Sequence, residues 1–223
     1  MVVITTQKPE EEVFEALKRY DAKKVTIVSC GTCAALCQTG GTEGLERWTE
    51  KLEEAGIQVV EGIVSDDVCD NRVMLKDLRK IDDAVKEADA IFTLSCGLGH
   101  QSIVKVLERK YPEKPVVIAN NTEFMGMTER IGRFYMRCRG CGDCLLNETG
   151  GICPITTCAK SLMNGPCGGM VEGKCEVGDY KLDCGWVLIY NRLKAMGRLD
   201  LFGKLRDSFD WSERGHQREV IFR

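Results

Sequence analysis

The sequence predicts an α/β fold in which a small, doubly wound parallel sheet of four strands precedes a cysteine-rich segment with little regular structure and a C-terminal helix. Three observations lead to this prediction. Four apolar, β-branched runs alternate with amphipathic stretches over residues 9–121. Eight of the 13 cysteines fall within residues 138–184, and a stretch with helical periodicity follows from Trp186.

The elements of the predicted sheet alternate along the chain. Strands are predicted at four runs that are apolar throughout: 24–30, 57–65, 88–96 and 114–121. Helices are predicted where apolar residues recur at spacings of three and four: 9–19, 42–55, 70–88 and 100–110. Thr42 is the expected N-cap of the second helix, and Gly56 is expected to end it. Apolar strands joined by such helices form a parallel sheet that helices cover on both faces, with right-handed crossovers.

Five cysteines follow the strands of this predicted sheet: Cys30, Cys33, Cys37, Cys69 and Cys96. Cys30 and Cys96 each end a strand within a Ser-Cys-Gly triplet. Open α/β sheets bind ligands beyond the carboxyl ends of their strands, so we expect these thiols to meet at one edge. The stretch SCGTCAALCQTGG lacks the G-x-G-x-x-G turn of dinucleotide sites, which favours a metal site there.

The spacing of these five thiols suits an iron–sulfur cluster. A [4Fe–4S] cluster takes four thiolates, usually including a close C-x-x-C pair, and Cys30 with Cys33 supplies that pair. Cys96 is the third expected ligand, and either Cys37 or Cys69 is the fourth. Two other interpretations are open: a thioredoxin-like dithiol at the C-x-x-C pair, and ordinary burial of free cysteines.

The second group of cysteines consists of Cys138, Cys141, Cys144, Cys153, Cys158, Cys167, Cys175 and Cys184. Glycine fills many of the gaps between them and aromatic residues are rare, so metal–thiolate bonds are expected to replace a core. The first three follow the C-x2-C-x2-C core of the bacterial ferredoxin run, although the next Cys-Pro comes after eight residues instead of three.

Eight thiols can fill two sites of four. The simplest partition gives the first four cysteines to one site and the last four to the other. One or two [4Fe–4S] clusters are expected in this segment, and structural zinc, which also takes four thiolates with C-x-x-C spacing, is the alternative.

Composition excludes several classes of protein. A net charge of −3 and a pI of about 5.6 argue against nucleic acid as the main partner. No stretch approaches 18 apolar residues and no secretory signal is visible, so we expect a cytoplasmic protein without a membrane span. A reducing cytosol favours metal ligation over disulfides. His100 and His216 lack a histidine partner at helical spacing and are expected to be surface or capping residues.

Three regions are predicted from these features: an α/β domain at 1–128, a cysteine-rich metal-binding domain at 129–185, and a helix with a tail at 186–223. The helix places four apolar residues on one face: Trp186, Ile189, Leu193 and Met196. The tail that follows has no clear period.

Three stretches of the sequence resemble a known family. The run CGDCLLNETGGICPITTCAKSLMNGPCGGMVEGKCEV closely resembles the cysteine-rich C-terminal domain associated with methylenetetrahydrofolate reductases, and its NGPCGG element is specific. LIYNRLKAMGRLD also resembles that family. SCGTCAALCQTGG resembles the start of the small iron–sulfur subunit of acetogen-type enzymes, so the resemblance spans most of the chain up to about residue 200.

The resemblance implies an electron-transfer subunit whose partner is a flavin-containing catalytic barrel subunit of a methylenetetrahydrofolate reductase, with further electron-donor subunits as additional partners. Such a barrel typically needs about 250 residues, which this chain does not offer. Cys30, Cys33, Cys37 and Cys96, with Cys69 as the rival of Cys37, match the cluster-bearing half. A zinc-stabilised interaction subunit without a redox role and an independent dithiol oxidoreductase are the competing functions.

Overall fold

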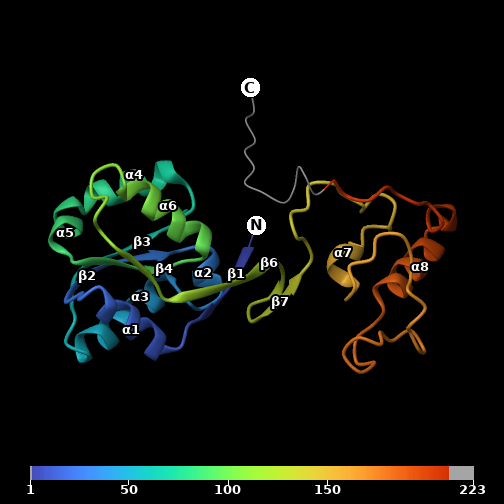
Figure 1. Cartoon of the computed structure of the whole chain (residues 1–223), viewed down its shortest axis with the longest axis horizontal. Helices are drawn as coiled ribbons and strands as arrows, with labels where there is room; N and C mark the ends of the chain where they lie inside the picture. The colour runs from blue at the N-terminus through green and yellow to red at the C-terminus, as the bar shows by residue number, and fades with distance from the viewer. Residues whose placement is uncertain (1, 211–223) are drawn as a thin grey trace. The chain divides into compact units, whose positions relative to one another are not determined.

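The computed structural model describes residues 2–210, and the chain divides into two compact units, Met1–Tyr135 and Met136–Arg223. Figure 1 labels the helices and strands of both units. The predicted domain boundary after residue 128 lies within strand β6 (Asn120–Arg130), so the division in the structure comes a few residues later.

A four-stranded parallel sheet forms the centre of the first unit and confirms the predicted fold class. Its strands are β2 (Lys24–Cys30), β3 (Gln58–Ser65), β4 (Ala90–Leu94) and β5 (Val116–Ile118). They lie in the order β3-β2-β4-β5, and Val28 of β2 pairs with Ile63 on one side and Thr93 on the other. The direction in which strands are added therefore reverses between β2 and β4.

Helices cover both faces of this sheet (Figure 1). One face carries α1 (Glu10–Arg19) and α3 (Gly41–Glu54); the other carries α4 (Asn71–Lys80), α5 (Asp82–Glu87) and α6 (Gly97–Leu107). Ile27 and Val28 of β2 belong to different cores because successive side chains of a strand point to opposite faces. Trp48 of α3 packs against Phe92 of β4 with ring centroids 5.0 Å apart.

Two helix boundaries differ from the predicted ones. The helix expected over 70–88 is broken at Ile81, which is buried at the junction between α4 and α5 and keeps the apolar period continuous. Thr42 is not the N-cap of α3, because that position belongs to Gly40. A Cβ atom on Gly40 would lie 2.7 Å from the Cβ of Ala34, so this close approach requires glycine. Gly56 follows the end of α3 as expected, with φ of +78°.

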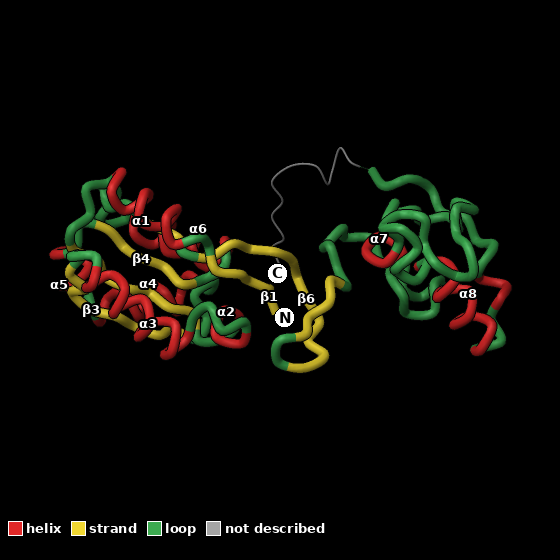
Figure 2. Tube along the Cα trace, turned by 90° about the horizontal axis from the view of Figure 1, so that it is seen from below, coloured by secondary structure: helices red, strands yellow, loops and turns green. Residues whose placement is uncertain are grey.

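A second, smaller sheet was not predicted. It has the order β1-β6-β7, formed by β1 (Val2–Gln7), β6 and β7 (Arg133–Met136) (Figure 2). β1 and β6 are antiparallel, and the register runs from Val2 opposite Gly126 to Gln7 opposite Asn120. The sequence of β6, NNTEFMGMTER, has no apolar run and is mostly half-buried or exposed, so its pattern does not distinguish a strand from a loop.

Turns and loops make up most of the second unit (Figure 2). Its helices are α7 (Pro154–Thr157), α8 (Gly185–Ala195) and the 3-10 turn η1 (Leu199–Leu201). Two small apolar clusters hold it together: one contains Trp186, Ile189 and Leu193 of α8, and the other is formed by Leu145, Ile155 and Phe209. Met196, predicted on the same face of α8, is 47% exposed.

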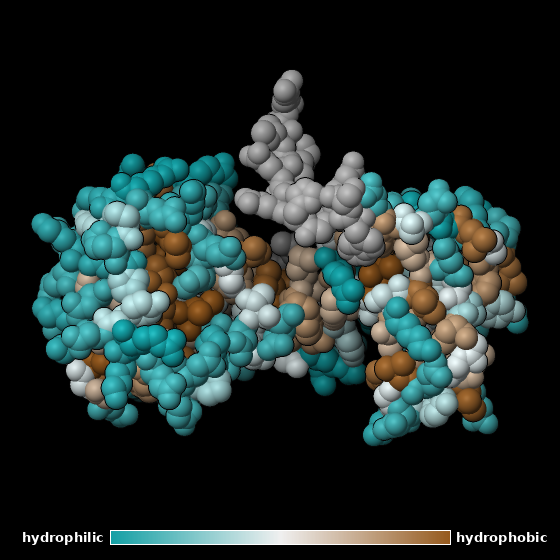
Figure 3. All heavy atoms as spheres, in the orientation of Figure 1, coloured by the Kyte–Doolittle hydropathy of each residue, from teal (hydrophilic) through white to brown (hydrophobic). Residues whose placement is uncertain are grey.

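The surface of the second unit mixes apolar and polar side chains, which Figure 3 shows as interspersed brown and teal spheres. The two clusters bury few side chains, and large apolar residues such as Leu182 and Leu205 are exposed. The predictions for the tail and for His216 fall outside the described residues. Within residues 2–210, no helix combines the length and the apolar character that crossing a membrane requires.

Trp48 should be one of the main contributors to the stability of the first unit. It extends from α3 and is fully buried between α1 and β4, where it contacts Phe14 and Phe92. We expect Trp48→Ala to lower the free energy of unfolding by about 3–5 kcal/mol, because the cavity left behind adds to the lost burial. Denaturant titration followed by circular dichroism measures this. Glu46→Ala, on the exposed side of the same helix, is the control, and a loss below about 1 kcal/mol for Trp48→Ala would contradict this account.

Candidate functional site

A cavity of about 390 Å³ lies in the first unit where β2 and β4 end. Four of the five predicted cysteines line it: Cys30, Cys33, Cys69 and Cys96. Cys30 is the last residue of β2, and Cys96 is the N-cap of α6, two residues after β4. This is the point where the strand order reverses, and open α/β sheets bind their ligands at such a point.

Local contacts hold the loops around this cavity. Thr32 Oγ1 donates a hydrogen bond to the carbonyl oxygen of Asp66 at 2.7 Å and lies 3.4 Å from Cys30 Sγ. Gly31 N–H donates to the carbonyl oxygen of Ser65 at 2.8 Å, which extends the pairing of β2 with β3. The loop after β2 and the loop after β3 are therefore joined, and this brings Cys33 and Cys69 to the same cavity.

The other three thiols of the cavity act electrostatically on Cys69. Cys30 and Cys96 are buried, Cys33 is half-buried and Cys69 is exposed as a residue. Burial raises the pKa of the Cys69 thiol, and the neighbouring Cys96 raises it further. The backbone N–H of Cys69 lowers this pKa, while Cys30 and Cys33 raise it by smaller amounts. Because the other thiols oppose the ionisation of Cys69, a nearby cation would favour its thiolate form.

Cys37 is placed differently from the other four. It is the C-cap of α2 (Cys33–Leu36), and its Sγ donates to the carbonyl oxygen of Val3 at 3.9 Å. It does not line the cavity, so the structure groups Cys69, and not Cys37, with the remaining three. Among residues 2–210, no three His, Cys, Asp or Glu side chains are arranged to hold a metal ion, so the four thiols share the cavity without converging as ligands.

The small antiparallel sheet covers this site. Val3 of β1 lines the cavity, and Thr122 Oγ1 of β6 accepts a hydrogen bond at 2.7 Å from the N–H of Gly97, the residue after Cys96. Thr5 Oγ1 and Thr39 Oγ1 lie 2.7 Å apart and connect β1 to the segment before α3. Sequence reasoning missed these residues. The β-branched run of β1, VVITT, was a signal that could have found Val3 and Thr5, whereas β6 has no strand pattern.

His100 lies on α6 but does not line the cysteine cavity. It is half-buried, and burial lowers the pKa of its imidazole. Its Nδ1 is buried without a hydrogen-bond partner among the described residues. Its position supports no role at the cysteine site.

The eight cysteines of the second unit differ in exposure. Cys184 is buried, four are half-buried, and Cys138, Cys144 and Cys167 are exposed. Gly140 N–H donates to Cys138 Sγ, and Gly169 N–H donates to Cys167 Sγ, both at 3.4 Å. Backbone donors of this kind stabilise thiolates, which metals require.

Two pairs of these cysteines pack into the two apolar clusters of the unit. Cys141 and Cys153 contact the cluster of Leu145, Ile155 and Phe209. Cys158 and Cys184 belong to the cluster around α8. The grouping follows the predicted division of the eight thiols into two sites, which stays a prediction.

The last part of the first unit and most of the second match a known family in sequence. Residues 117–212 match the family model described as methylene-tetrahydrofolate reductase C terminal. The match supports the methylenetetrahydrofolate reductase family. It agrees with the resemblance expected from the NGPCGG run. The cavity of Cys30, Cys33, Cys69 and Cys96 lies outside the matched residues. A comparison with curated proteins finds no match.

Within the residues that match this family model, Arg206 fixes one cysteine loop. Its Nη2 donates to Asp143 at 2.8 Å, and its Nη1 donates to Glu148 and to the carbonyl oxygen of Cys144, both at 3.2 Å. Asn164 holds the backbone of Arg206 through two further hydrogen bonds, of 3.0 and 2.8 Å. The segment after α8 is thereby attached to the loop of Cys141 and Cys144.

Replacing Arg206 should loosen this loop. Hydrogen bonds to charged groups contribute about 1.5–3 kcal/mol, and because these groups are partly exposed we expect a local loss of about 1–2 kcal/mol in Arg206→Gln. Backbone amides of residues 143–148 should then exchange hydrogen roughly 5–30-fold faster, as mass spectrometry can measure. Arg198→Gln, whose arginine pairs with nearby Asp200, is the matched control, and unchanged exchange in Arg206→Gln is the result that disagrees.

Proposed function

We propose that this chain is the iron–sulfur electron-transfer subunit of a methylenetetrahydrofolate reductase complex and passes electrons to the flavin of a partner catalytic subunit. The cavity with four cysteines carries this proposal. The family match of residues 117–212 supports the choice of complex.

The lining of the cavity fits a [4Fe–4S] cluster in the number and type of donors. Cys30, Cys33, Cys69 and Cys96 would hold it, and such a cluster supplies one-electron transfer when bound. Val3, Val68 and Leu98 supply apolar lining beside the thiols, of which Cys30 and Cys96 are buried. Burial and hydrogen bonds near the sulfurs set reduction potentials, so this lining would tune the potential of the site.

Gly99 allows the loops to close around these thiols. A Cβ atom at Gly99 would lie 2.9 Å from Val68 Cγ1 and 3.0 Å from the Cβ of Ser95. A side chain there would push the first turn of α6 away from the loop that carries Cys69. Glycine at this position therefore allows Cys96 and Cys69 to line the same cavity.

The partner in this proposal is a flavin-containing barrel subunit that binds the folate. The first unit of this chain is an open α/β sheet and the second is a loop-rich cysteine unit, so neither described unit is itself a barrel. The eight thiols of the second unit would hold one or two further [4Fe–4S] clusters, with zinc as an option at one site.

The second candidate function is a zinc-stabilised structural subunit of the same complex. The small clusters and the prevalence of turns in the second unit favour it, because structural zinc stabilises domains that lack a sufficient core. Iron and acid-labile sulfide in the first unit distinguish the two functions, since a purely structural zinc subunit contains neither.

Cys33→Ala tests whether electrons reach the flavin through the cysteine cavity of the first unit. In the complex with the flavin subunit, we expect this variant to slow flavin reduction by an artificial donor that enters through this chain. Direct chemical reduction of the flavin should keep its wild-type rate, because the catalytic site belongs to the partner. Rapid-mixing absorbance of the flavin measures both rates, and size-exclusion chromatography confirms assembly.

Cys37→Ala is the matched control, because this cysteine caps the helix that begins at Cys33 but does not line the cavity. It should transfer electrons at the wild-type rate. Undiminished transfer in an assembled Cys33→Ala complex, or folate reduction by the isolated chain, would count against the proposal.

A further inference from the structure

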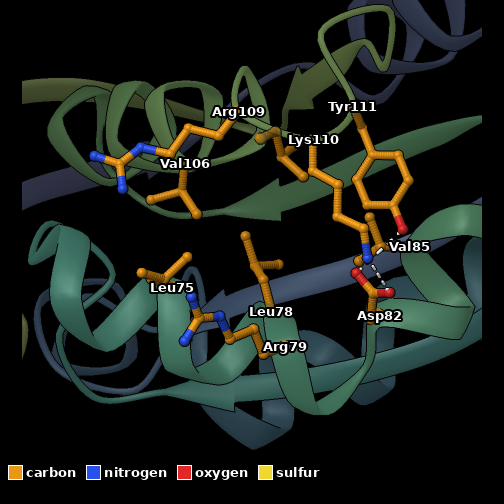
Figure 4. A pocket seen from close by; sticks show the side chains of 10 residues that line it. Leu75, Leu78, Arg79, Asp82, Val85, Val106, Arg109, Lys110 and Tyr111 are labelled. Atoms are coloured by element: carbon orange, nitrogen blue, oxygen red, sulfur yellow. Dashed lines mark hydrogen bonds and ion pairs between the residues drawn. The ribbon is translucent and has the colours of Figure 1, made fainter.

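A groove of about 360 Å³ lies between α4, α5 and α6 of the first unit, away from the cysteines. It sits at the C-terminal ends of α4 and α6 (Figure 4). The cysteine cavity lies at the start of α6. Its floor consists of Leu78, Val85, Val106 and Leu107, all of them buried members of the core. The depression is therefore preformed by packed side chains and lies within the size range of small-molecule sites.

Two arginine side chains lie at the same end of the groove. Figure 4 shows the guanidinium groups of Arg79 and Arg109 at the same end, with Leu75 and Val106 beside them. Arg79 follows Leu75 by four residues on α4, which places both on one side of that helix, and Arg109 lies two residues after the end of α6. Both arginines are exposed, and neither has an ion pair or a hydrogen bond to another side chain within residues 2–210.

The other end of the groove is electrically balanced. Lys110 pairs with Asp82, and Tyr111 Oη donates to Asp82 Oδ1 at 3.1 Å (Figure 4). The hydrogen bond from Lys110 lowers the pKa of the Asp82 carboxyl, which stays ionised and neutralises the lysine. Tyr111 also lines this end with its ring. The groove thus has an apolar floor, a neutral end and a cationic end.

We propose that this groove binds a small amphipathic anion, with the apolar body of the ligand on the floor and its carboxylate or phosphate at Arg79 and Arg109. Planar guanidinium groups bind such oxyanions through paired hydrogen bonds, and two of them at one end fix the orientation of the ligand. The apolar body displaces water from Leu75, Leu78 and Val106, which adds affinity in proportion to the area covered. The site does not depend on a metal and is independent of the proposed redox function.

Octanoate is the probe, and octanol and octylammonium are its matched analogues with neutral and cationic heads. Methyl-labelled full-length protein is titrated and the leucine and valine methyl signals are followed by NMR. We expect octanoate to shift the methyl signals of Leu78 and Val106 saturably and to bind roughly 10-fold or more tightly than octanol, a difference of about 1.4 kcal/mol. Octylammonium should bind more weakly than either.

The variant with both Arg79→Gln and Arg109→Gln should bind octanoate no better than octanol, while its affinity for octanol stays that of the wild type. Arg130→Gln, a substitution at another exposed arginine of the same unit, should leave octanoate binding unchanged. Leu75→Trp, which fills the groove from its half-buried rim, should weaken both ligands. Methyl spectra without ligand verify that each variant is folded.

Three results would overturn the proposal. The first is the absence of saturable shifts at Leu78 and Val106 up to about 10 mM octanoate, which corresponds to negligible affinity. The second is equal affinity for octanoate and octanol in the wild-type protein. The third is that an acidic, apolar peptide shifts these methyl signals while octanoate does not, which would assign the groove to a protein partner instead.

Discussion

In the Cys144→Ser protein, we expect proteases to cleave residues 138–184 while the first unit stays intact. Among the described residues of the second unit, the two apolar clusters contain seven buried residues, four around α8 and three around Ile155. The two cores of the first unit contain 13 and 12. Metal–thiolate bonds would then supply most of the stability of the second unit, and structural zinc binding is worth about 10–16 kcal/mol in small domains.

Limited proteolysis with mass spectrometry of the fragments measures this effect on the full-length chain. The matched control is Cys37→Ser, the same substitution in the first unit at a thiol that does not line the cysteine cavity. It should leave the cleavage pattern unchanged. If Cys144→Ser also gives the wild-type pattern, ordinary packing suffices to fold the second unit, and its dependence on metal is wrong.

Cys69→Ser is expected to remove one iron–sulfur cluster, whereas Cys37→Ser is expected to keep it. The two cysteines are alternatives in the sequence, but only Cys69 lines the cavity with Cys30, Cys33 and Cys96. Anaerobically purified wild-type protein should contain iron and acid-labile sulfide. The Cys69→Ser protein should lose the equivalent of one four-iron cluster, roughly four iron and four sulfide per chain.

Iron, sulfide and zinc analysis under strictly anaerobic conditions makes this comparison, with a parallel reconstitution of each variant. Circular dichroism verifies that both variants keep the α/β fold. The opposite ranking, with iron lost from Cys37→Ser and kept in Cys69→Ser, would show that the cavity does not define the ligand set. A colourless wild-type protein that contains only zinc after reconstitution contradicts the redox function as a whole.

The parallel sheet could be predicted because its two central strands, β2 and β4, are apolar on both faces. Strands β2 and β4 are buried throughout apart from Lys24, and such runs carry an unambiguous signal. Strand β6 could not be predicted, since most of its residues are half-buried or exposed and no pattern of period two results. The break at Ile81 was also hidden, because neither glycine nor proline marks it and the buried isoleucine keeps the period.

The candidate site could be predicted in part from its position at the ends of strands. The Ser-Cys-Gly triplets correctly placed Cys30 and Cys96 at the edge of the sheet. The choice between Cys37 and Cys69 depended on where two loops fold, and the hydrogen bond from Thr32 to Asp66 that joins them has no signature in the sequence. The place of Val3 in the cavity could not be anticipated either, because its strand is distant in sequence from every cysteine there.

The pairing of β1 with β6 also has a consequence for the order of assembly during synthesis. Val2 pairs with Gly126, so β1 cannot find its partner until the ribosome has released nearly the whole first unit. Strands β2, β3 and β4 are all released earlier and can associate first, whereas contacts between distant segments form late. Over that interval the edge of the sheet that carries Cys30 and Cys96 is not yet covered by β1, so these thiols are more accessible to solvent than in the folded unit.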